Sequence, residues 1–290
     1  MKPNLAAAAV LLAFAAVAVT AQERRPGFAG GGEIFVPEDI LTARAVPSRS
    51  TGFPDWTNAP AFARDVFTLA RVRYDKSAVR SRRGSGGWTT DLPDADLNLS
   101  FRLQQMTALR VDPDGRLLRL TDPALHDHPF LFLSAPGSLN LREDEVLALR
   151  RHLLNGGFLL MDDFWGEREW ANCEAVFHQV FPDRRFFDLP PDHPLYRGAF
   201  TITAKGQVPN VRLGIASEQT GVTWEREDGR TVHHRAIADD RGRLMVLALH
   251  NTDTADGWER EGESGYYFHT FSEKIAYPLG VNIILYVMTH

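Results

Sequence analysis

The feature that most constrains the fold is the alternation of short apolar runs with longer amphipathic segments. Residues 129–134, 158–161 and 244–249 are almost entirely apolar, which is typical of strands buried on both faces of a parallel sheet. Residues 95–106 and 143–154 instead carry apolar side chains at helical spacing. This alternation predicts an α/β fold with a doubly wound, mostly parallel sheet.

Differences in residue composition divide the chain into three parts. Residues 1–21 combine a basic start, a short apolar run and a Val-Thr-Ala sequence before Gln22, which predicts a cleaved signal peptide. An uncleaved N-terminal anchor is the alternative. Residues 22–60 are rich in Gly, Pro, Arg and Ser, which predicts a flexible arm or linker. Residues 61–290 are then a single α/β domain, in a protein that we expect to be periplasmic or secreted.

Charge and cysteine content exclude several classes of protein. The 32 basic and 37 acidic residues give a net charge of −5, so we expect no nucleic-acid partner. No stable membrane span is expected after signal cleavage. Cys173 is the only cysteine, so no internal disulfide forms. A G-x-S-x-G nucleophile motif is absent from the sequence.

Polar side chains follow two of the apolar runs, at the point where each predicted strand ends. Because parallel strands direct their carboxyl ends to one edge of a sheet, we expect these side chains to form one ligand site. The predicted ligand-binding residues are Asp162, Asp163, Trp165, His250, Asn251, Asp253, Asp256 and Trp258.

The two adjacent acids raise a question of orientation. Neighbouring side chains in an extended strand point to opposite faces, so one of Asp162 and Asp163 faces the site while the other caps a turn or pairs with an arginine. The alternative is that both are turn or cap residues. In a catalytic interpretation, Asp163 and His250 are the candidate base and acid.

The segment after residue 249 offers several oxygen ligands, but its spacing differs from that of an EF-hand loop. We therefore predict no metal and no cofactor, and an Asx-rich surface turn is the simpler interpretation. Trp165 and Trp258 beside carboxylates would suit a sugar ring, although tryptophan is also common in protein cores. Residues 80–88 form a basic, glycine-rich loop that would hold an anion or remain solvated. His233 and His234 are expected in a polar connection.

Several longer motifs are similar to a known bacterial family, the domain of unknown function 4159 family. The motifs are "WTTDLPDADLN" from Trp88, "PFLFLSAPG" from Pro129, "LRRHLLNGGFLLMDDFWG" from Leu149, "DDRGRLMVLALHNTDTADGWER" from Asp239 and "FSEKIAYPLGVNIILYVMTH" from Phe271. The resemblance covers roughly residues 64–290. It implies a class I glutamine amidotransferase-like (flavodoxin-like) fold, but no activity, because the chain lacks the cysteine on a nucleophile elbow that those enzymes require.

Three functions remain open at this point. The first is a non-enzymatic domain of the cell envelope that binds a small polar molecule or glycan, or acts as a scaffold. The second is a hydrolase acting on a glycan or another cell-envelope substrate through Asp163 and His250. The third is an interaction module that binds a cell-envelope protein partner through residues 22–60.

Overall fold

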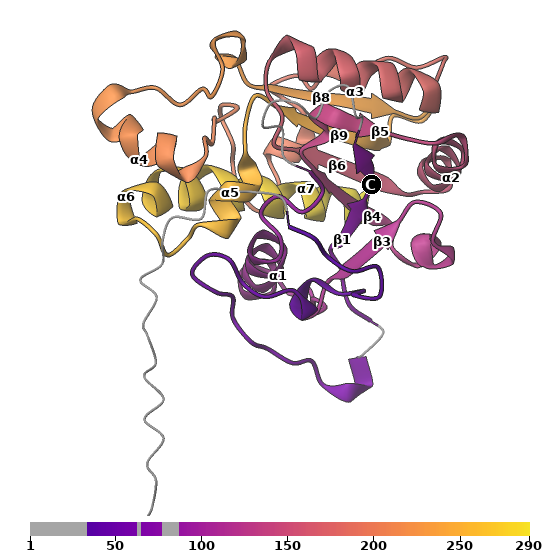
Figure 1. The fold of residues 1–290 in the computed structure, drawn as a ribbon, viewed down its shortest axis with the longest axis horizontal. Helices are drawn as coiled ribbons and strands as arrows, with labels where there is room; N and C mark the ends of the chain where they lie inside the picture. Colours follow the sequence, from indigo (N-terminus) through magenta and orange to yellow (C-terminus); the bar gives the residue numbers. More distant parts are fainter. Residues whose placement is uncertain (1–33, 63–64, 77–86) are drawn as a thin grey trace, which may run out of the picture. The chain divides into compact units, whose positions relative to one another are not determined.

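A computed structural model describes residues 34–62, 65–76 and 87–290. Its centre is a seven-stranded sheet in the order β3-β1-β4-β6-β9-β8-β7 (Figure 1). The strands are β1 Ala70–Arg73, β3 Arg116–Arg119, β4 Phe130–Ser134, β6 Phe158–Asp162, β7 Phe187–Asp188, β8 His233–Ala238 and β9 Leu244–His250. Strands β3, β1, β4, β6 and β9 are parallel, whereas β8 is antiparallel to both neighbours. The predicted mostly parallel α/β sheet is confirmed.

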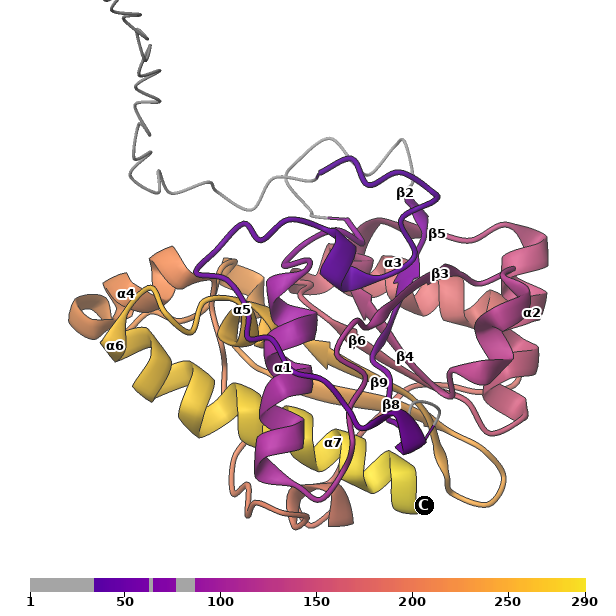
Figure 2. The ribbon, with the colours of Figure 1, turned by 90° about the horizontal axis from the view of Figure 1, so that it is seen from below.

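Helices cover both faces of this sheet, which explains why its central strands are apolar throughout. Helices α1 Asp94–Met106 and α7 Tyr277–Thr289 lie on one face of the sheet (Figure 2). Phe130 and Phe132 of β4 belong to the core on this face. Leu131 and Leu133 belong to the opposite core, beneath α2 Glu143–Leu154 and α3 Gly166–Val180. Side chains alternate across a strand, so a strand between two cores must be apolar at every position.

The remaining elements are short. They are α4 Val211–Thr220, α5 Thr254–Glu259, α6 Gly265–Tyr267, a π-helix at Phe268–Ala276, and the two-stranded antiparallel sheet of β2 Asp75–Lys76 and β5 Leu139–Asn140. The π-helix continues into α7, and Pro278 lies at the junction of the two helix types. Residues 268–289 therefore form two successive helices of different type.

The expectation for His233 and His234 is wrong. Both lie in β8, and His234 is completely buried. Its Nδ1 atom is 2.9 Å from the hydroxyl of Tyr196. An antiparallel strand near the sheet edge has one face that is only partly buried and carries polar side chains. Its sequence therefore lacks the apolar run that marks the central strands.

The predicted signal peptide, residues 1–21, lies outside the described residues, as does most of the basic loop at 80–88. The expected arm at 22–60 is described from residue 34. Val36, Ala43 and Val46 are buried there in a small core that includes Leu92, Leu97 and Leu117. No helix in the described segments is long and apolar enough to cross a membrane.

Candidate functional site

The segments that follow β1, β6 and β9 bring three carboxyl groups together at the carboxyl ends of the parallel strands. Asp91 follows β1 and precedes α1, Asp163 follows β6 directly, and Asp253 lies between β9 and α5. One oxygen from each side chain lies within 4.8 Å of the others. The order of strands reverses between β1 and β4, and ligands of such sheets bind at the carboxyl edge near this reversal.

The backbone of this edge has an unusual conformation. Four non-glycine residues of the described segments have positive φ angles, namely Asp91 at 62°, Ala135 at 52°, Asp163 at 60° and Asn251 at 63°. Ala135, Asp163 and Asn251 directly follow β4, β6 and β9, whereas Asp91 lies between β2 and α1. Left-handed conformations of this kind cost free energy and gather at functional sites.

Asp162 and Asp163 point in different directions, which answers the question raised by their adjacency. Asp162 is completely buried at the end of β6, and its Oδ2 accepts a 2.7 Å hydrogen bond from the backbone N–H of Ala255. Burial raises the pKa of Asp162 to about 7. Asp163 is half-buried and lies beside Asp91 and Asp253. Asp162 therefore fixes the first turn of α5, while Asp163 faces the site.

Asp253 has both a capping and a site role. Its Oδ1 accepts a 2.9 Å hydrogen bond from the N–H of Asp256 at the start of α5. This bond fixes the position of the carboxyl group that approaches Asp163. The predicted Asx-rich surface turn is wrong, because Asn251, Asp253, Asp256 and Trp258 are all buried.

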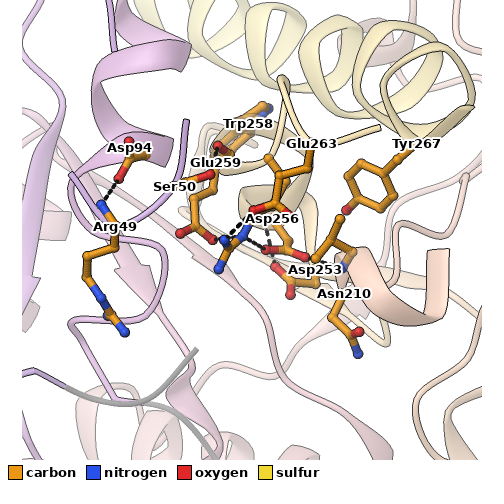
Figure 3. A network of polar contacts seen from close by, with 12 residues as sticks. Arg49, Ser50, Asp94, Asn210, Asp253, Asp256, Trp258, Glu259, Glu263 and Tyr267 are labelled. Carbon is orange, nitrogen blue, oxygen red and sulfur yellow. Dashed lines mark hydrogen bonds and ion pairs between the residues drawn. The ribbon is translucent and has the colours of Figure 1, made fainter. Parts of the chain in front are cut away.

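A second group of carboxyl groups adjoins the first and shares Asp91 with it. It contains Asp256 and Glu259, both on α5 and drawn in Figure 3. Asp256 accepts a hydrogen bond from the N–H of Val211. The guanidinium Nε of Arg260 lies 3.4 Å from Oδ1 of Asp256 and 2.8 Å from Oε2 of Glu259. This second group therefore already contains its own cation.

Crowding of buried acids raises the pKa of each. Burial, together with the nearby Asp256 carboxyl, raises the pKa of Asp91 to about 8 against the opposing effect of Arg71 and Arg260. Burial likewise holds the pKa of Asp163 well above its usual value, with Asp91 as the largest charge effect. The pKa of Asp253 rises well above its usual value through burial and the charge of Asp163. The site favours a partner that supplies positive charge.

His250 is completely buried in the structure, on the strand β9. Its Nε2 lies 3.1 Å from the carbonyl oxygen of Gly166, and its Nδ1 lies 3.1 Å from a guanidinium nitrogen of Arg235. The tautomer that satisfies both contacts is protonated at Nε2, with Nδ1 accepting from Arg235. Burial lowers the pKa of His250 to about 4. Both ring nitrogens are thus used within the fold.

The other predicted residues connect the two loops or fill the core. Asn251 accepts a 2.8 Å hydrogen bond from the N–H of Gly166 and donates through Nδ2 to the carbonyl of Thr231. Trp165 is 3% exposed and Trp258 is 0% exposed, so neither ring offers a face for stacking on a ligand. The segments after β6 and β9 do lie side by side, as their positions after parallel strands predicted.

Sequence reasoning missed Asp91 and Glu259. Asp91 is more than seventy positions from Asp163 in the sequence, inside "TTDLPDAD", which resembles the start of a helix. The available signal was its place between a strand and the following helix, which is also the place of Asp163. Glu259 lies one helical turn beyond Asp256, on the same face of α5.

The described turn after β4 lacks the cysteine of a nucleophile elbow. The sharp turn after β4 has the left-handed residue found in a nucleophile elbow, but the residue is Ala135. Cys173 lies on α3, completely buried, with Sγ 3.4 Å from the carbonyl oxygen of Pro136.

Comparison with known proteins places the chain in a family. No curated protein matches it. The family model described as "Domain of unknown function (DUF4159)" matches residues 68–288, which include the seven strands of the sheet and the carboxyl cluster. The match spans most of the chain, so this protein belongs to the DUF4159 family.

Proposed function

We propose that this domain binds a polar ligand at the carboxyl ends of β1, β6 and β9, and that the ligand presents positive charge to Asp91, Asp163 and Asp253. One observation carries the proposal: Oδ2 of Asp91 is buried without a hydrogen-bond partner, beside two further carboxyl groups. A buried carboxyl oxygen without a donor costs several kcal/mol, roughly 2–7 for a polar group. A ligand that supplies charge or donors removes this cost.

Binding fits the geometry better than acid–base hydrolysis by Asp163 and His250. Proton transfer requires a ring nitrogen within hydrogen-bond reach of the substrate, and both nitrogens of His250 face protein groups. Ala135 has no group that acts as a nucleophile.

The surroundings define the chemistry of the ligand. Buried carboxyl groups repel anions, whereas hydroxyl, ammonium or metal-bound groups interact favourably with them. Trp165 and Trp258 are buried, so a carbohydrate would be recognised through its hydroxyl groups and not by stacking.

Substitution of Asp253 tests whether these acids form a binding site or a stabilising network. In the presence of a chelator, Asp253→Asn should raise the free energy of unfolding by about 0.5–2 kcal/mol, because it removes a charge from the cluster while asparagine preserves the cap of α5. Chemical denaturation provides the measurement.

Asp96→Asn is the matched control. Asp96 is also buried, but it accepts three hydrogen bonds from Arg71, so its substitution should cost about 3–5 kcal/mol. If Asp253→Asn destabilised the protein in the same way, the carboxyl cluster would be structural and the proposal would be wrong.

We further propose that the chain is exported to the cell envelope and is related to the class I glutamine amidotransferase-like fold. The pattern of residues 1–21 supports export, and N-terminal sequencing of the exported protein should begin at Gln22. An intact Met1 on a membrane-retained chain would contradict it. The strand order and the left-handed turn after β4 support the fold relationship.

A further inference from the structure

Two groups of carboxyl oxygens at the site have the spacing of metal ligands, and they share Asp91. One consists of Asp91, Asp163 and Asp253, and the other of Asp91, Asp256 and Glu259. In each group the three oxygens lie within 4.8 Å of one another. Oxygens bound to a single Ca²⁺ at about 2.4 Å lie at most about 4.8 Å apart, so both spacings suit one ion.

The two groups differ in whether a basic side chain contacts them. Arg260 contacts both Asp256 and Glu259, and its Nη1 lies 2.6 Å from Glu263. A guanidinium group therefore already supplies positive charge to the second group. In the described part of the chain, Asp91, Asp163 and Asp253 have no ion pair with a basic side chain. Arg71, the buried arginine that influences Asp91, is instead paired with Asp96 at 2.5 Å.

Asp91 supplies an independent observation that points to a bound group. Its side chain is 6% exposed, and its Oδ2 has no hydrogen-bond partner. Asp91 also belongs to the short set of residues held in a left-handed conformation at this edge. A buried carboxyl oxygen without a donor is costly unless a cation occupies the adjacent position.

We propose that Asp91, Asp163 and Asp253 bind one hard divalent cation, of the class Ca²⁺, Mg²⁺ or Mn²⁺. This inference rests on the proposed function, in which positive charge enters this site, and identifies that charge as a metal ion. All three ligands are carboxylates, which suit these ions, whereas Zn²⁺ sites are built mainly from histidine and cysteine. Oxygens that lie within 4.8 Å of one another fit the roughly 2.4 Å bonds of Ca²⁺, and the shorter bonds of Mg²⁺ need oxygens within about 4.2 Å of one another.

The proposed ion would have coordination positions left for a ligand. Three single carboxyl oxygens leave about three or more of the six to eight positions that such ions use. Asp91 and Asp253 are buried, whereas Asp163 is half-buried, so the ion is reached from the side of Asp163. Water or oxygen atoms of the polar ligand would complete the coordination from this side.

Calorimetric titration of the metal-free full chain with CaCl₂, MgCl₂ or MnCl₂ tests the inference. We expect one ion to bind per chain for at least one of the three. Asp91→Asn and Asp163→Asn should each weaken binding at least tenfold, because each removes a charged ligand. Asp192→Asn, which removes an exposed acid outside the site, should leave affinity unchanged. Circular dichroism confirms that each variant is folded.

Glu259→Gln distinguishes the two groups of carboxyl oxygens. Affinity should change less than threefold in Glu259→Gln if the ion binds to Asp91, Asp163 and Asp253. Loss of binding in Glu259→Gln with retention in Asp163→Asn would overturn the assignment, as would absence of binding by the full chain at millimolar ion concentrations. If no ion binds but Asp253→Asn still stabilises the protein, the metal inference fails while the proposed polar-ligand site stands.

Discussion

Burial keeps three histidines of this domain in their neutral form. Burial lowers the pKa of His152 to about 4, that of His234 to about 3 and that of His250 to about 4. The imidazole of an unfolded chain has a pKa of about 6.5. Acid therefore protonates the unfolded chain before it protonates these three side chains in the folded protein.

The contribution of these three histidines to stability should decline as the pH falls below about 6.5, whereas buried acids with raised pKa values, such as Asp91 and Asp162, act in the opposite direction over this range. A histidine with a lowered folded-state pKa contributes its full stability above the unfolded value and loses it as the pH falls towards the folded value. Each group contributes a slope of up to about 1.4 kcal/mol per pH unit. Urea denaturation at pH 7.5, 6 and 5 measures this slope.

His234→Phe should remove one histidine's share of the pH dependence, so its stability relative to the parent chain should rise by up to about 1.4 kcal/mol per pH unit as the pH falls below about 6.5. The variant removes one of the three protonation sites, at a pH-independent cost of about 1 kcal/mol for the hydrogen bond lost by Tyr196. An unchanged slope in His234→Phe would show that His234 has the same pKa in the folded and unfolded chains, which would contradict the effect of its burial.

Cys173 is a core side chain, and its substitution should affect local packing and its contact with Pro136 but not the site. Its thiol is completely buried on α3. Cys173→Ala should cost on the order of 1 kcal/mol and leave ligand or ion binding intact. Denaturation and the calorimetric titration described above measure the two quantities. Loss of binding in a folded Cys173→Ala variant would contradict this account.

At the scale of elements, the position of α5 depends on close contact with the helices that cover it. A Cβ atom on Gly257 would lie 2.6 Å from Cβ of Ala276 on the π-helix. A Cβ atom on Gly280 of α7 would lie 2.9 Å from Trp258. Since α5 follows Asp253 and carries Asp256, its distance from these helices sets the geometry of the carboxyl cluster.

Gly257→Ala should therefore disturb both stability and binding. The added methyl group forces α5 away from Ala276, at a cost of about 1–3 kcal/mol, and moves the backbone that positions Asp253. Gly265→Ala is the control, because no atom lies within 4 Å of its added Cβ, and it should change stability by less than about 0.5 kcal/mol. Equal effects of the two substitutions would argue against the close contact.

The elements that were predictable from sequence are those whose local pattern has one physical explanation. The run at 158–161 is apolar at every position because two cores enclose β6, and the helix predicted at 143–154 is α2 Glu143–Leu154. Strand β8 does not have such an apolar run, because the polar residues His233, His234 and Arg235 occupy its first half. Its sequence therefore did not predict a buried strand. Asp91 was missed because only the pairing of β1 with β4 and of β4 with β6 brings it near Asp163.

At the scale of the whole molecule, the domain extends beyond the family match on its N-terminal side. The match begins at residue 68, whereas Val36 and Val46 are buried in the small core against Leu92, Leu97 and Leu117. Asp94, at the start of α1, accepts hydrogen bonds from Oγ of Ser48 at 2.6 Å and from the N–H of Arg49 at 3.0 Å. Residues 36–49 are therefore part of the folded unit.

Removal of this segment should destabilise the protein. A chain that begins at Asp65 should lose about 3 kcal/mol or more relative to a chain that begins at Gln22, since two buried valines contribute roughly 1.5–3 kcal/mol each. Thermal and urea denaturation of the two chains provide the comparison. Equal stability would show that the contacts of residues 36–49 contribute nothing to folding.

The same segment has a consequence for self-association. The outer edge of β3 would otherwise expose backbone groups that another molecule could pair with. In this protein the backbone N–H of Leu117 donates to the carbonyl of Leu41, and Glu38 forms an ion pair with Arg119. At the opposite edge, β7 is only two residues long and ends in Asp188. One edge is thus covered and the other is too short to extend, so a chain that lacks residues 34–49 exposes a strand that can nucleate aggregation.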